Sequence, residues 1–318
     1  MDDIRALGPD TPRWGVDCVR LLDEAFAVQR GSFIDDFPIW DPSLSRREVC
    51  QLGYFSQNQL LSTAGIRLAA LKLAEDCFVK VGVVGAVATH PLHRGRGYSK
   101  QLILHLIAWA RQHQVNWVFL WSSETTFYQK LGFNGYGQQL RLPLREVSWP
   151  RLGNVSPAKT HFNGDIYSGW NPGIFSLMQK RKSGFFLRDE DRVWIEKHRN
   201  VQWFYVGGEM PTAYLGLGRG IDLKDCIHEW GGDDRDLVHL LRYVSCIRPE
   251  SCLLGTPDML AQFGVTSDSG SLESLCLARE LSALTFFLDG ELTKRDPSIP
   301  QGDSLENLSF WIWGLDGA

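Results

Sequence analysis

The sequence predicts a mixed α/β (α+β) fold in which helices flank a central sheet, and three observations carry this prediction. Valine-rich and aromatic runs at 77–89 and 115–121 have the apolar density of strands that are buried on both faces. The segment between them, 99–112, repeats its apolar residues at helical spacing. A strand, a helix and a second strand in this order predict a right-handed crossover at the centre of the sheet.

The other elements of the first half follow from local periodicity and from turn-forming residues. The predicted elements are a helix at 13–28, a loop or short helix at 31–42, strands at 49–55 and 59–71, a short helix at 125–131 and strand-like pieces at 133–145.

The pattern weakens at 150–172, where glycine, proline and asparagine are frequent, so a boundary is predicted near 148–160. This divides the chain into units at 1–148 and 160–318. In the second unit, the predicted elements are a basic, partly helical stretch at 173–199, strands at 201–207, 211–217 and 225–230, a helix at 233–246, a strand and helix within 253–263, and a strand at 308–315. Their coarse order repeats that of the first unit. The glycine-rich run 214–220 is interpreted as a strand and hairpin.

Composition excludes several classes of function. A net charge of −4 and a pI near 6.1 give no reason to expect a nucleic-acid partner. The N-terminus lacks the apolar core of a signal peptide, and no run is long and apolar enough to span a membrane. Seven scattered cysteines without Cys-x-x-Cys predict reduced, mostly buried thiols in the cytoplasm, and the eight histidines show no metal-binding spacing. We therefore expect no bound metal, and no oligomeric state is predicted.

The segment that carries chemistry is Arg94-Gly95-Arg96-Gly97-Tyr98-Ser99, which follows a buried strand and begins a helix. Glycines in such a turn let successive backbone N–H groups face one concavity, and the helix N-terminus adds partial positive charge. Arg94 and Arg96 can add charge-assisted hydrogen bonds, so the segment suits a pyrophosphate. The alternative is a glycine turn that only links a strand to a helix.

Two segments resemble the motifs of one superfamily. The run from Val87 to Ser99 resembles motif A of the GNAT superfamily of N-acetyltransferases, and the run from Ser123 to Phe133 resembles motif B, with Tyr128 shortly before Gly132-Phe133. The resemblance covers about residues 50–145. It implies a GNAT-like mixed central sheet and acetyl-CoA as the acyl donor.

The resemblance also implies a role for each matching residue. Val87, Ala88 and Thr89 would bind the pantetheine arm, and Arg94, Gly95, Arg96, Gly97, Tyr98 and Ser99 would hold the pyrophosphate. Ser123 and Glu124 would lie beside the thioester, and Tyr128 would face its sulfur.

In the chemistry that this layout implies, a neutral amine attacks the thioester directly. Tyr128 is predicted to protonate the departing thiolate, with a purely packing tyrosine as the alternative. Glu124 is a candidate general base, and the equal alternative is a carboxylate that favours a helix N-terminus.

The pattern Ser-Glu-x-x-x-Tyr also resembles the enhanced-intracellular-survival type of acetyltransferase. That type pairs an active unit with a degenerate GNAT-like unit, followed by a sterol-carrier-like domain. The resemblance implies a catalytic unit at 1–148 and a degenerate unit at 160–318. That type can use its C-terminal carboxylate as base, but this sequence has no length for the third domain, so we do not expect Ala318 to act in this way.

The acceptor is predicted only as a class. Acids and aromatics alternate in one loop of the first unit, which would suit a cationic amine; a packed acidic surface loop is the alternative. The residues are Phe33, Asp35, Asp36, Phe37, Trp40 and Asp41. The predicted function is transfer of an acetyl group to a primary amine, on a small molecule or a peptide. The alternatives are a peptide or protein N-acetyltransferase and a non-catalytic acyl-CoA-binding regulator.

Overall fold

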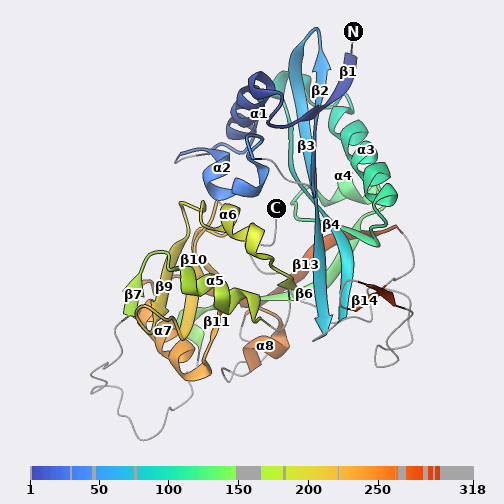
Figure 1. Cartoon of the computed structure of the whole chain (residues 1–318). Helices are drawn as coiled ribbons and strands as arrows, with labels where there is room; N and C mark the ends of the chain where they lie inside the picture. The colour runs from blue at the N-terminus through green and yellow to red at the C-terminus, as the bar shows by residue number, and fades with distance from the viewer. Residues whose placement is uncertain are drawn as a thin grey trace, which may run out of the picture.

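The computed structural model describes residues 2–28, 31–44, 48–74, 77–147, 166–181, 184–220, 222–261, 263, 270–281, 286–288 and 291–293. Its strands belong to one mixed sheet that runs through both halves of the chain, with helices on its faces (Figure 1). The predicted fold class is thus confirmed. In the part of the chain that is described, no helix is long and apolar enough to cross a membrane.

The first unit begins with four strands that pair antiparallel in chain order. These are β1 (Asp2–Leu7), β2 (Val49–Ser56), β3 (Gln59–Ala74) and β4 (Cys77–Thr89). Helix α3 (Tyr98–Gln112) then returns the chain to β5 (Trp117–Leu120), which lies parallel to β4. The remaining elements are α1 (Pro12–Ala25), α2 (Phe33–Asp36), η1 (Pro38–Trp40), η2 (Pro91–His93), α4 (Thr125–Gln129) and η3 (Leu144–Glu146).

The second unit repeats this order. Antiparallel strands β7 (Ile166–Ser168), β9 (Gln202–Val206), β10 (Ala213–Leu217) and β11 (Cys226–Gly232) lead through α7 (Asp234–Ile247) to β12 (Cys252–Gly255), which is parallel to β11. The hairpin interpretation of 214–220 agrees with β10 and β11, which pair antiparallel. The remaining elements are α5 (Pro172–Gln179), η4 (Asp189–Asp191), α6 (Arg192–Ile195) and α8 (Pro257–Ala261).

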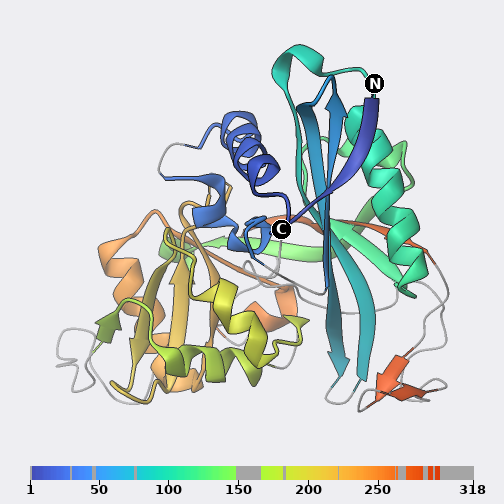
Figure 2. The ribbon, with the colours of Figure 1, turned by 45° about the horizontal axis from the view of Figure 1, so that its top comes forward.

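The two units exchange their last strands. Strand β6 (Asn134–Pro143) follows α4 of the first unit but pairs with β12 of the second, while β13 (Ser271–Glu280) follows α8 but pairs with β5. The two exchanged strands also pair with each other, so the local order is β5-β13-β6-β12. Figure 2 shows these strands crossing between the two units.

Three further short strands add to the sheet. They are β8 (Gly184–Phe185), which pairs with β3, β14 (Phe286–Leu288), which pairs with β4, and β15 (Glu291–Thr293), which pairs with β14. The predicted strand at 308–315 and the whole of the predicted boundary at 148–160 lie outside the described residues. The division into units at these positions therefore stays a prediction.

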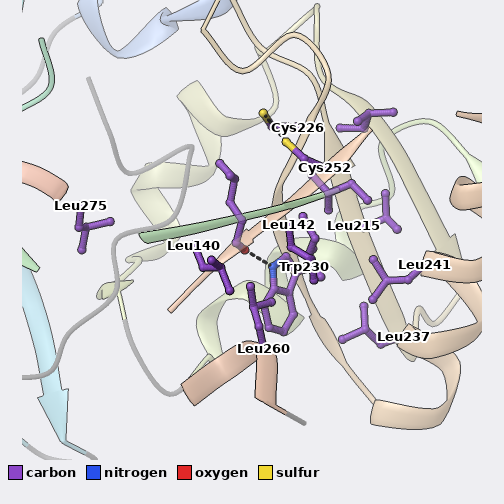
Figure 3. Packing of buried hydrophobic residues seen from close by; sticks show 14 of the residues in the cluster. Leu140, Leu142, Leu215, Cys226, Trp230, Leu237, Leu241, Cys252, Leu260 and Leu275 are labelled. Atoms are coloured by element: carbon purple, nitrogen blue, oxygen red, sulfur yellow. Dashed lines mark hydrogen bonds between the residues drawn. The ribbon is translucent and has the colours of Figure 1, made fainter. Parts of the chain in front are cut away.

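Exchange of strands gives the two units a common core. Leu140 and Leu142 of β6 pack in one cluster with Leu215 and Leu241 of the second unit (Figure 3). The same cluster contains Phe119 of β5. Two further clusters lie under α1 and under α3. The cluster under α1 also includes second-unit residues such as Phe175 and Trp194, whereas the cluster under α3 consists mainly of first-unit residues.

Candidate active site

Strands β4 and β5 part at the centre of the first unit. Their parallel ladder runs from Val81 opposite Trp117 to Val83 opposite Phe119. Beyond this point β5 ends at Leu120, whereas β4 continues to Thr89. The carboxyl ends of neighbouring parallel strands are where open α/β sheets bind ligands, so this parting is the candidate binding position.

A β-bulge lies on the part of β4 that extends past β5. Gly85 opposes Gly65 and Ala88 opposes Thr63, so Ala86 and Val87 together oppose the single residue Ala64. Ala86 has φ of 51°, a conformation that is strained for a residue with a side chain. A bulge takes backbone groups out of the regular ladder, which leaves them able to bind a ligand.

Polar contacts fix the end of β4 and the turn that follows. The Ser62 hydroxyl donates to the Ala88 carbonyl at 2.7 Å and lies 2.8 Å from the Thr89 hydroxyl. Arg94 Nε donates to the Thr89 carbonyl at 3.3 Å, and the His90 ring accepts from the backbone N–H of Leu92. The turn therefore has a defined shape before any ligand binds.

The turn itself has the geometry of an anion cradle. Gly95 and Gly97 have φ of 78° and 80°, a conformation that glycine adopts without strain, and a Cβ at either position would meet open space. Gly97 is the N-cap of α3, where no side chain caps the helix and no acid stands in the first turn. The first N–H groups of α3 thus remain available, and the side chains of Arg94 and Arg96 are exposed beside them. These residues fit a pyrophosphate.

Tyr98 and Ser99, the last residues of the predicted cradle, are half-buried. The Tyr98 ring stacks on Tyr54 of β2 with centroids 4.1 Å apart, and the Tyr54 hydroxyl donates to Asp2 at 3.2 Å. The Tyr98 ring therefore anchors the start of α3 to the sheet, which leaves its backbone N–H as its contribution to the cradle.

Tyr128 lies on the other arm of the parting, in the helix that follows β5. Tyr128 is 7% exposed, packs edge-on against Phe133, and hydrogen-bonds to Ser122, two residues after the end of β5. Burial raises the pKa of Tyr128 to about 12, the Ser122 hydrogen bond opposes this rise, and the charge of Glu124 adds to it. The hydroxyl therefore holds its proton at neutral pH.

Ser123 and Glu124 are both exposed at the start of α4. Glu124 occupies the N-cap position, where its carbonyl accepts from the backbone of Phe127 at 3.0 Å, but its carboxylate makes no capping hydrogen bond. Its own N–H donates to the Ser122 hydroxyl at 3.0 Å. Ser122 thus joins Glu124 and Tyr128, although the sequence motif did not single it out; its position two residues after a buried strand was the available signal.

The acidic and aromatic loop of α2 and η1 makes contacts with the second unit. Asp36 is 7% exposed and accepts from Asn200 at 2.8 Å and from the Gly220 N–H at 3.1 Å. Phe37 lies under the guanidinium of Arg219, 4.6 Å from its ring centroid. These contacts all reach into the second unit, so the loop joins the two units, and the alternative of packed aromatics describes it better than an acceptor site.

A cavity of about 240 Å³ lies where α1 meets the end of β4. Asp17, Arg20 and Glu24 of α1 line it, together with Gln59 at the start of β3 and His90, which directly follows β4. Arg20 is paired with Asp17 at 2.8 Å, which leaves a net negative lining. Such a lining is complementary to a cation.

Residues 15–135 match the family described as "Acetyltransferase (GNAT) domain", so the chain contains a GNAT acetyltransferase domain. The match includes the parting of β4 and β5, the bulge, the glycine turn and Tyr128.

One curated protein is similar in sequence to part of this chain, and solved structures are similar in fold. Over 66 residues, 20% of this chain, the sequence is 41% identical to a glucosamine 6-phosphate N-acetyltransferase of Trypanosoma brucei brucei; it spans 45% of that protein. Eis1 of Mycobacterium abscessus has a similar fold, with a TM-score of 0.56 and 14% identity over 88% of this chain and 73% of its own. A GCN5-related N-acetyltransferase of Anabaena variabilis has a TM-score of 0.58 and 12% identity at the same coverage.

Proposed function

We propose that this protein transfers an acetyl group from acetyl-CoA to a primary amine, with all of the chemistry in the first unit. The observation that carries the proposal is the point where β4 and β5 diverge. A turn with the geometry of an anion site follows β4, and a buried, protonated tyrosine follows β5. The glycine turn begins the helix that leaves β4, and Tyr128 lies in the helix that leaves β5.

The acyl donor is held by backbone groups along β4 and α3. The N–H groups from Gly95 to Ser99 bind the pyrophosphate, with Arg94 and Arg96 as charged partners. Val87, Ala88 and Thr89, past the end of the β5 ladder, bind the pantetheine arm. The bulge at Ala86 and Val87 supplies backbone donors for the oxyanion that develops at the thioester carbon.

Tyr128 acts as the general acid toward the leaving sulfur. Its hydroxyl is protonated across the neutral range because burial raises its pKa to about 12. The same buried environment also raises the pKa of the CoA thiol that leaves beside Tyr128. The pKa values of proton donor and acceptor are therefore closer together, which makes the proton transfer less unfavourable. Glu124, exposed on the same arm, is the proposed base that takes the proton of the incoming ammonium.

The acceptor is proposed to be a small cationic amine. The cavity beside His90 is modest in volume and carries the carboxylates of Asp17 and Glu24, which favours a small amine over an extended peptide. The name of the trypanosomal relative makes amino sugars and their phosphates a natural part of any acceptor panel. A cytoplasmic location belongs to the same proposal, on the basis of the scattered, unpaired cysteines.

The test is thiol release from acetyl-CoA with a panel of small amines, polyamines, amino sugars and peptides. We expect turnover with at least one small amine, and a higher KM for that amine in Glu24→Gln, with the affinity for acetyl-CoA unchanged. Tight binding of acetyl-CoA without thiol release for any acceptor would instead identify a regulator. Release with peptides alone would overturn the small-amine acceptor.

A further inference from the structure

Two cysteines of the second unit face each other from neighbouring strands. Cys226 begins β11 and Cys252 begins β12, and the two are register partners in the parallel ladder. Their sulfur atoms lie 3.0 Å apart, in hydrogen-bond contact (Figure 3). Neighbouring strands are spaced about 4.8 Å apart, which is within the range of Cα separations that a disulfide spans. A bond between these sulfurs therefore needs side-chain rotation and no movement of the strands.

A guanidinium group lies against both sulfurs. Arg141 of the exchanged strand β6 places Nη1 2.8 Å from Cys226 Sγ and 3.7 Å from Cys252 Sγ. The hydrogen bond with Cys226 lowers the pKa of the Cys252 thiol, and the charge of Arg141 adds to this effect against the opposing effect of burial. By contrast, burial raises the pKa of Cys18 to about 11. The pair is thus biased toward a thiolate, which is the nucleophilic form.

A cavity of about 500 Å³ has Cys252, but not Cys226, among its lining residues. Cys252 lines this cavity, together with Arg141, Arg145, Glu146 and Glu250. Cys252 is 8% exposed and Cys226 is 1% exposed. Cys252 is therefore more accessible to a small polar oxidant than Cys226 is. The Cys226 sulfur is buried and in contact with the Cys252 sulfur.

We propose that Cys252 and Cys226 form a redox modification site that a peroxide converts to an intramolecular disulfide. The Cys252 thiolate attacks one oxygen of hydrogen peroxide, the O–O bond breaks, hydroxide leaves, and the sulfur becomes a sulfenic acid. Cys226 then attacks this sulfur, and its proton leaves with the hydroxyl group as water. In total two thiols and one peroxide give one disulfide and two waters, and a thiol reductant reverses the change.

The test is peroxide titration of the reduced, folded full-length chain, followed by alkylation and peptide mapping. We expect a cross-linked pair of peptides that contains Cys226 and Cys252, and its loss after dithiothreitol treatment. Cys246→Ser is the matched control, because Cys246 is exposed and lies outside the pair; this variant should form the same cross-link at the same rate. A cross-link elsewhere, or none at a peroxide dose that oxidises Cys246, would overturn the proposal.

Single variants separate the two sulfurs. When Cys226→Ser is treated with peroxide, oxidation should stop at a Cys252 sulfenic acid, which a diketone reagent traps. In Cys252→Ser the same treatment should leave Cys226 reduced. Arg141→Gln should slow disulfide formation about tenfold, the effect of one pKa unit on the thiolate fraction, and Arg141→Lys should restore part of the rate. Circular dichroism checks that the wild type and Arg141→Gln are both folded. Equal rates of disulfide formation in the two proteins would then show that Arg141 has no part in the mechanism.

Discussion

The two units share one order of elements, yet they differ where the helix begins after the central strand. In the first unit, α3 starts at Gly97, which has no side chain to cap the helix, and its first turn holds no acid. In the second unit, α7 starts at Asp233, whose carboxylate accepts from the N–H groups of Arg235 and Asp236. The second helix therefore satisfies its own free N–H groups and repels an anion, while the first leaves them open.

The parting of the parallel strands differs as well. In the second unit the ladder between β11 and β12 ends at Ile227 opposite Leu253. Just past this end, the Trp230 indole of β11 donates to the Leu254 carbonyl of β12 at 2.9 Å (Figure 3). The same indole packs edge-on against Phe263. One aromatic side chain thus bridges the two strands three residues past the end of the ladder, where the first unit has Ala86 of the bulge.

The third difference concerns the helix after the second parallel strand. Tyr128 is the fourth residue of α4, and Leu260 is the fourth residue of α8. Both are buried, but only the tyrosine carries a hydroxyl. The two units thus share an order of elements but differ in charge, volume and hydroxyl chemistry at the three positions that form the candidate site of the first unit.

The largest expected effect is on turnover. It follows from removing the hydroxyl of Tyr128, which the corresponding Leu260 of the second unit lacks. Tyr128→Phe removes the proposed acid and keeps the ring, so we expect kcat to fall about 1,000-fold, or ~4 kcal/mol, with little change in the affinity for acetyl-CoA. Steady-state kinetics and calorimetric binding of acetyl-CoA measure the two quantities. Unchanged turnover would leave Tyr128 with a packing role only.

The next effect is on stability, at the bridge of the second unit. Trp230→Ala removes a buried aromatic ring and its hydrogen bond, so the free energy of unfolding should fall by about 3–4 kcal/mol. Trp230→Phe, which keeps most of the volume, should lose about 1–2 kcal/mol. Denaturant titration measures both values. Equal losses would mean that the hydrogen bond matters more than the filling of the gap.

A carboxylate at the start of α3 tests the electrostatic difference. Gly97→Asp should weaken acetyl-CoA binding about 100-fold, or ~2.7 kcal/mol, since the new carboxylate repels the pyrophosphate and caps the same N–H groups. Gly97→Asn is the matched control, because asparagine has the same shape and the same tolerance for positive φ without the charge. If Gly97→Asp and Gly97→Asn bind acetyl-CoA equally weakly, the loss comes from the added side chain and not from its charge.

The smallest effect is expected at the corresponding cap of the second unit. Asp233→Ala should lower the free energy of unfolding by about 1 kcal/mol, because two N–H groups of α7 lose their acceptor. Asp233→Asn, which can still accept these bonds, should lose less. Thermal denaturation compares the two, and acetyl-CoA binding to the chain should be the same in both variants. Tighter binding in Asp233→Ala would show that the second unit had kept a latent site.

Most elements of the first unit could be predicted because their signals are local. Helix α3 and strand β4 lie within a residue of the predicted positions, since periodicity and turn residues act over a few neighbours. Strands β1 and β13 received no prediction. Asp2–Leu7 is short and rich in charge, and Ser271–Glu280 is exposed over its first four residues, so neither has the apolar density of a buried strand.

The candidate site divides in the same way. The glycine turn, the following helix and Tyr128 were predictable because each is encoded in one contiguous segment. Ser122 and the bulge at Ala86 were not, since a hydrogen bond to Tyr128 and a change of register depend on neighbouring segments. For Asp36, composition suggested a ligand, but partners more than 160 positions away, Asn200 and Gly220, hold its carboxylate.

Glycine conformation and apolar periodicity act locally, so the mixed α/β class, the crossover at the centre of the first unit and the glycine turn at the start of α3 could be predicted from the sequence alone. Only the tertiary structure decided that β6 and β13 change places, that the α2 loop joins the two units, and that Cys226 meets Cys252 beside Arg141. The choice of strand neighbours depends on burying a shared core, and that core forms only when segments far apart in the chain meet.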